Sequence, residues 1–123
     1  MRDKPKTIGI IGFGNMGRAI GERLKEKYQI YVFDKDKNKT KNLPGITVAA
    51  SLSDLVNNSA TIILAVKPQD FESLLNELKD KIKQQLVISI AAGITTAYIE
   101  RFLSKTKVVR AMPAVSNMGT QPV

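Results

Sequence analysis

The stretch TIGIIGFGNMG, residues 7–17, decides the fold of this chain. Its first part, Thr7–Ile11, is a short apolar run bounded by glycine, which is typical of a buried strand. Gly12, Gly14 and Gly17 follow with the spacing G-x-G-x-x-G. An apolar stripe with helical spacing begins inside this loop and continues past it. The stretch therefore predicts a strand, a glycine loop and a helix in immediate succession.

The glycine loop has the composition of a dinucleotide phosphate site. Gly12 permits the tight turn, Gly14 lets the backbone approach a pyrophosphate because it has no Cβ, and Gly17 lets the helix pack against the strand. The helix N-terminus offers free N–H groups and a partial positive charge to the phosphates. The motif alone is a weak signal, but here it lies between a strand and a helix, as the mechanism requires.

Strand and helix patterns alternate along the rest of the chain. Strands are expected at Thr7–Ile11, Gln29–Phe33, 46–48, 61–66, 86–90 and 107–111. Residues 34–42 form either a loop or a short helix. Strands separated by helices predict a Rossmann-type, doubly wound α/β fold, with a mainly parallel six-stranded sheet in the order 3-2-1-4-5-6. We expect residues 1–123 to form this one dinucleotide-binding domain.

The composition excludes several kinds of chemistry. The chain has no Cys and no His, which excludes disulfides, thiolate catalysis and histidine proton transfer, and we expect no metal site. No apolar run approaches the roughly 20 residues of a membrane span, and no signal-peptide core is present, so we expect a cytoplasmic protein without membrane contact. The net charge of +8 suits an anionic ligand. Nucleic-acid binding is disfavoured, since no aromatic residues interleave with the lysines of residues 35–41.

Asp34 ends the second expected strand, where an acidic residue binds the hydroxyls of the adenosine ribose. Such a carboxylate favours NAD and repels the 2′-phosphate of NADP. Lys35 and Lys37 lie next to it and would neutralise that phosphate. These signals conflict, so the choice between NAD and NADP stays open.

Four motifs resemble pyrroline-5-carboxylate reductase. They are IGFGNMG at residues 11–17, AVKPQ at residues 65–69, SIAAGIT at residues 89–95 and RAMP at residues 110–113. Deazaflavin-dependent NADP reductases and hydroxy-acid dehydrogenases have a similar first loop, but the second and third motifs fit them less well. The resemblance implies reduction of the C=N bond of 1-pyrroline-5-carboxylate to proline, by hydride transfer from NADPH or NADH.

The resemblance also implies contacts between these loops and the cofactor, at the carboxyl edge of the sheet. With Asp34 and Lys35 added from the residues themselves, the expected cofactor-binding residues are Gly12, Phe13, Gly14, Asn15, Met16, Gly17, Asp34, Lys35, Ala65, Val66, Lys67, Pro68, Ala92, Gly93, Met112 and Pro113. No catalytic residue is assigned within this chain.

The chain departs from the family pattern in two ways. Ala114, Val115 and Ser116 replace the usual Asn-Thr-Pro, which weakens polar contacts near the nicotinamide or the substrate. The family also carries a helical domain that forms homo-oligomers and supplies much of the substrate site, and we expect it to be absent from residues 1–123. The chain alone is then expected to bind the cofactor without appreciable turnover, as a monomer or self-associated through an apolar surface near the sixth strand.

Two alternatives to a pyrroline-5-carboxylate reductase stay open. One is a dinucleotide-binding relative that lacks catalysis, which the replaced residues at 114–116 favour. The other is a reductase of the same superfamily that acts on a different substrate.

Overall fold

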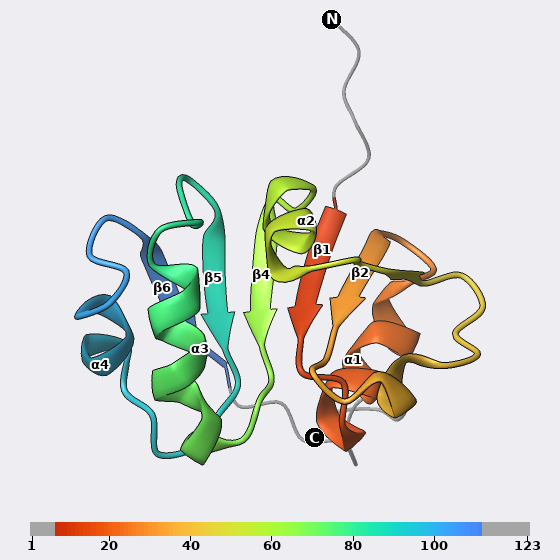
Figure 1. The fold of residues 1–123 in the computed structure, drawn as a ribbon, viewed down its shortest axis with the longest axis horizontal. Coiled ribbons are helices and arrows are strands. Elements are labelled where there is room, and N and C mark those ends of the chain that lie inside the picture. The colour runs from red at the N-terminus through yellow and green to blue at the C-terminus, as the bar shows by residue number, and fades with distance from the viewer. Residues whose placement is uncertain (1–6, 112–123) are drawn as a thin grey trace, which may run out of the picture.

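The chain forms a six-stranded sheet flanked by helices in a computed structural model that describes residues 7–111 (Figure 1). The strands are β1 (Thr7–Ile11), β2 (Gln29–Phe33), β3 (Thr47–Val48), β4 (Thr61–Leu64), β5 (Leu86–Ser89) and β6 (Lys107–Arg110). Their order is β3-β2-β1-β4-β5-β6, and every neighbouring pair is parallel. The predicted fold class, sheet and strand order are confirmed.

Helices connect the strands as the alternating pattern predicted. They are α1 (Asn15–Leu24), α2 (Leu52–Asn57), α3 (Phe71–Leu78) and α4 (Thr96–Glu100), with short 3₁₀ helices η1 (Lys37–Thr40) and η2 (Pro68–Asp70). Side-chain caps start two of these α-helices, α2 and α4. Ser51 Oγ accepts a hydrogen bond from the N–H of Asp54 at 3.1 Å, and Thr95 Oγ1 accepts one from the N–H of Tyr98 at 3.0 Å. These oxygens satisfy N–H groups that a helix leaves free in its first turn.

Two hydrophobic clusters lie on opposite faces of the sheet. Successive side chains of a strand point to opposite faces, so adjacent residues of β4 separate the two clusters. Ile62 and Leu64 belong to the cluster that contains residues of α2, α3 and α4. Ile63 belongs to the cluster that contains Ile20 of α1. The helices therefore cover both faces, as the doubly wound fold requires.

Gly9 lies in the middle of β1, where a glycine ordinarily weakens a strand. A Cβ at this position would overlap Ser59 Oγ and lie 2.5 Å from Leu55 Cδ2. Both side chains belong to the α2 region, and Leu55 is fully buried. The glycine therefore allows α2 and the turn after it to pack close against the central strand.

The carboxyl ends of the labelled strands meet at one edge of the sheet, where α1 and α3 begin (Figure 1). β4 ends at Leu64, two residues before the predicted end. The N–H of Ala65 still donates to the carbonyl of Ile11 at 2.8 Å, and the chain then turns into η2. Within residues 7–111, no helix has the length and apolarity to cross a membrane. Because the carboxyl ends of the parallel strands meet at one edge, the loops that follow β1, β2 and β4 lie together there.

Candidate functional site

The glycine loop turns sharply between β1 and α1. Gly12 has a φ of +95°, which L side chains rarely adopt, and its N–H donates to Phe33 O at 2.8 Å. A Cβ on Gly12 would lie 2.8 Å from both the carbonyl carbon of Ala65 and the nitrogen of Val66. The turn is therefore held between the ends of β2 and β4, with no room for a side chain.

The start of α1 rests directly on this turn. A Cβ on Gly17 would overlap the carbonyl oxygen of Gly12. Gly14 is the N-cap residue, and its carbonyl accepts the N–H of Arg18 at 2.9 Å. No side chain of the described residues caps α1, and its first turn carries no acidic residue. The positive end of the helix dipole thus stays available to an anion.

Gly14 has open space where a side chain would project. In the described part of the chain, the only heavy atom within 4 Å of its Cβ position, apart from those of Gly14 and its two chain neighbours, is the Nζ of Lys39, at 4.0 Å. The backbone angles of Gly14, φ −76° and ψ −156°, are accessible to other residues. The local fold therefore does not require a glycine at this position, whereas the close approach of a phosphate does.

Asp34 holds the glycine loop with its carboxylate. Oδ2 accepts the N–H of Phe13 at 2.7 Å, and Oδ1 accepts the N–H of Asp36 at 2.8 Å. Hydrogen bonds to an ionised acceptor contribute about 1.5–3 kcal/mol each. Each carboxylate oxygen keeps acceptor capacity beyond these bonds. Asp34 therefore fixes the loop after β2 against the loop after β1, and it can still accept hydroxyl groups from a ligand.

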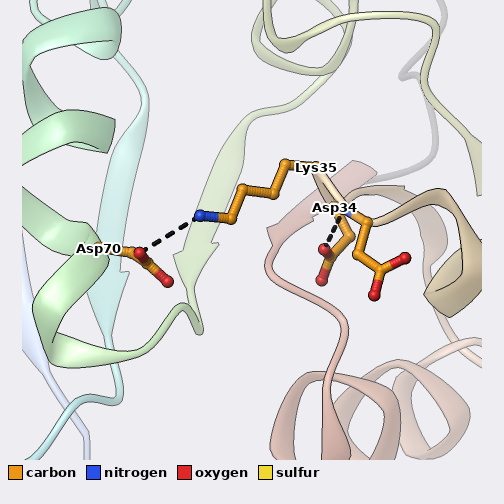
Figure 2. Close-up of polar contacts among 4 residues, drawn as sticks. Asp34, Lys35 and Asp70 are labelled. Carbon is orange, nitrogen blue, oxygen red and sulfur yellow. Dashed lines mark hydrogen bonds and ion pairs between the residues drawn. The ribbon is translucent and has the colours of Figure 1, made fainter.

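A cleft of about 430 Å³ opens beside these loops, a volume typical of small-molecule sites. The predicted residues that line it are Gly12, Gly14, Asp34, Lys35, Ala65, Val66 and Lys67. Lys35 Nζ forms an ion pair with Asp70 Oδ1 at 3.3 Å, and Figure 2 shows the Lys35 side chain extended toward Asp70. The Lys35 side chain is 80% exposed, so this pair contributes about 0–1 kcal/mol.

Several other predicted residues do not line the cleft. Phe13 is only 1% exposed, with its ring in the cluster beneath α1, so its backbone alone faces the loop. Ala92 and Gly93 are exposed in the loop after β5. Asn15, Met16, Gly17 and Pro68 flank the cleft without lining it. Met112 and Pro113 lie outside the described residues.

The cleft also has lining residues that we did not predict. They include Asp36, Lys39, Leu52, Gln69, Asp70 and Ser73. The strand order supplies the signal that would have found some of them. Because β2 and β4 flank β1, the loop after β2 and the start of α3 face each other across the glycine loop. Within residues 7–111, no group of three acidic residues is placed to hold a metal ion.

The sheet, the glycine loop and the cleft at the carboxyl edge together define a dinucleotide-binding protein of Rossmann type. Residues 7–93 match the sequence model of a family described as NADP oxidoreductase, coenzyme F420-dependent. The chain therefore belongs to this family. Its motifs predicted a resemblance to pyrroline-5-carboxylate reductases, and comparison with individual proteins confirms it.

Three similar proteins show the extent of the likeness. The pyrroline-5-carboxylate reductase of Aquifex aeolicus is 39% identical over 116 residues, which cover 89% of this chain and 43% of that protein. A structure of a pyrroline-5-carboxylate reductase from Coxiella burnetii has a TM-score of 0.81 and 35% identity, covering 89% of this chain and 44% of that chain. The Plasmodium falciparum pyrroline carboxylate reductase, solved with NADP bound, has a TM-score of 0.79 and 28% identity, covering 94% and 44%. The chain thus spans less than half the length of each.

Proposed function

We propose that this chain is the NAD(P)H-binding domain of a pyrroline-5-carboxylate reductase, which reduces 1-pyrroline-5-carboxylate to proline. The observation that carries the proposal is the open face of Gly14 at the uncapped start of α1, beside a cleft of suitable size. This is a cradle that a phosphate would fill and a Cβ would obstruct. The proposed substrate is the one in the names of the similar reductases.

In this proposal the cofactor supplies the hydride, and the chain binds and orients it. Residues 12–17 would hold the pyrophosphate through backbone N–H groups. Asp34 and Lys35 would border the adenosine ribose. Residues 65–68 would run beside the cofactor, and Ala92 with Gly93 would border the nicotinamide end.

We further propose that the reductase has a second, helical domain that forms the oligomer and completes the substrate site. The coverage of the relatives supports this, since each is more than twice as long as the part that this chain matches. A cofactor held without that site lacks the positioning of the imine, which is a large part of the catalysis. On this proposal residues 1–123 bind the cofactor but reduce the imine substrate at a negligible rate.

Fluorescence titration of residues 1–123 with NADH and NADPH, followed by a reductase assay with 1-pyrroline-5-carboxylate, tests these statements. We expect saturable binding of at least one cofactor and negligible oxidation of it. Failure to bind either cofactor would contradict the cofactor role. Full turnover by residues 1–123 would contradict the proposed division of the substrate site. If the longer protein reduced another imine or coenzyme F420 in preference to 1-pyrroline-5-carboxylate, the proposed substrate would be wrong.

Replacing Asp34 with alanine tests how the ribose is recognised. We expect the dissociation constant for NADH to rise about tenfold or more, because the ribose hydroxyls lose a charged acceptor. NADPH should lose less, since the carboxylate that repels its 2′-phosphate is also removed. The loop loses its bonds to Phe13 and Asp36, which weakens both cofactors alike. The ratio of the two dissociation constants is therefore the quantity to measure, and an unchanged ratio would remove Asp34 from the ribose site.

A further inference from the structure

Lys39 lies over the open face of the glycine loop. Its Nζ is 4.0 Å from the Cβ position of Gly14, and the side chain lines the cleft. Lys39 belongs to η1, which follows β2, whereas Gly14 follows β1. A cation from one loop thus lies near the phosphate-facing side of another.

The acidic groups nearest to Lys39 along its own loop are engaged elsewhere. The carboxylate of Asp34 accepts two backbone N–H groups. The carboxylate of Asp36 accepts the N–H of Asn38 at 3.0 Å and so caps η1. Across the cleft, Asp70 pairs with Lys35. Within residues 7–111, no ion pair or hydrogen bond holds the ammonium of Lys39.

The capped start of η1 positions this lysine. Asp36 fixes the first turn of η1 through Asn38, and the N–H of Lys39 donates to Asp36 O at 3.0 Å. Asp34 in turn ties the beginning of this loop to the backbone of Phe13. The backbone that carries Lys39 is therefore anchored to the glycine loop, although the Lys39 side chain itself has no partner in the described part of the chain.

We propose that Lys39 is a further cofactor-binding residue, whose ammonium contacts the pyrophosphate where it passes Gly14. The inference rests on the proposed cofactor function. In a G-x-G-x-x-G loop, backbone N–H groups and the helix N-terminus receive the pyrophosphate, and the missing Cβ of the second glycine marks where it approaches. Lys39 adds a mobile point charge at that place, and an ammonium binds phosphate well in this role.

The location distinguishes this assignment from recognition of the 2′-phosphate of NADP. The pyrophosphate is common to NADH and NADPH, so a lysine that contacts it supports both cofactors equally. Asp34, the residue expected at the ribose, lies at the end of β2, and Lys35 follows it directly. The Lys39 ammonium instead lies 4.0 Å from the Cβ position of Gly14.

The test compares Lys39→Gln with Lys41→Gln in residues 1–123. Lys41 is an exposed lysine just after η1 that does not line the cleft. Since both variants replace a lysine with glutamine, they have the same net charge. Fluorescence titrations with NADH and NADPH at low and high salt give the dissociation constants. We expect Lys39→Gln to raise the dissociation constants for NADH and NADPH about tenfold each, so that their ratio is unchanged. The salt dependence of binding should also decrease. Lys41→Gln should change either constant less than about twofold.

Competition with ADP-ribose, which has the pyrophosphate and no nicotinamide, should show the same loss in Lys39→Gln. Equal affinities of the two variants would overturn the inference while leaving the cofactor function intact. A loss confined to NADPH would also overturn it, because Lys39 would then read the 2′-phosphate. If the unaltered chain bound neither cofactor, the proposed function and this inference would both fail. Circular dichroism checks that both variants are folded.

Discussion

Gly14→Val is expected to abolish dinucleotide binding while the chain stays folded. The backbone angles of Gly14 suit an ordinary residue, and the space around its Cβ position is open apart from the flexible end of Lys39. The cost to the fold is that of a poorer helix N-cap, about 1 kcal/mol. The branched side chain of valine would instead occupy the volume that a pyrophosphate needs at the start of α1.

The expected loss in affinity is large. A pyrophosphate kept away from the helix N-terminus loses at least two charge-assisted hydrogen bonds to backbone N–H groups. At about 1.5–3 kcal/mol each, this raises the dissociation constant on the order of a hundredfold or more. Titration with NADH and NADPH measures the loss, and urea unfolding of the ligand-free variant measures stability. Gly14→Ala, with a single methyl group, should give an intermediate loss.

Two results would contradict this prediction. Undiminished affinity of Gly14→Val would place the pyrophosphate away from Gly14 and would remove the observation that carries the proposed function. A variant that unfolds would mean that Gly14 serves the fold, contrary to the open space around it. The combination of retained fold and lost binding is therefore specific to a glycine kept for a ligand.

The sequence predicted the fold well because local and long-range signals agree. Most strands are apolar, β-branched runs, the breaks contain glycine, proline or a polar cluster, and parallel connections through helices admit few strand orders. The ends of elements were predicted less well. Apolar residues with helical spacing continue from Phe71 to Ile82, a longer span than α3, which ends at Leu78. Periodicity does not distinguish a last helical turn from the turn that follows it.

The candidate site was predicted where a backbone motif defines it and missed where tertiary contact does. Gly12, Gly14 and Asp34 follow from their positions after strands. Lys39 and Asp70 reach the cleft only because η1 and the start of α3 face it, and their sequence neighbourhoods resemble ordinary solvated loops. Gly9, inside a buried strand, is a local sign that another element packs close against β1.

Gly17→Ala, in contrast to a change at Gly14, is expected to lower the stability of the fold. A Cβ at this position overlaps the carbonyl oxygen of Gly12, and it lies 3.2 Å from the carbonyl carbon. This backbone has little freedom to move, because the N–H of Gly12 is bonded to Phe33 and a Cβ on Gly12 would itself strike the loop after β4. At the other side, Ile20 anchors α1 in its cluster with 6% exposure.

The sign of the change identifies its cause. In a helix without close neighbours, replacing glycine with alanine stabilises by up to about 1 kcal/mol. Forcing a methyl group into a packed backbone contact costs about 1–3 kcal/mol or more, so we expect Gly17→Ala to be destabilised overall. Urea unfolding measures the free energy, which for a domain of this size is about 5–15 kcal/mol in total.

Gly21→Ala is the matched control, since it makes the same substitution in the same helix. Its Cβ would meet the edge of the Phe13 ring at 3.0 Å and no backbone outside α1 within 3.4 Å, so the obstacle is one side chain. We therefore expect a smaller loss than at Gly17. A Gly17→Ala variant as stable as the unaltered chain would show that the loop can retreat from α1. That result would contradict the view that the glycine loop holds the N-terminus of α1 rigidly at the phosphate site.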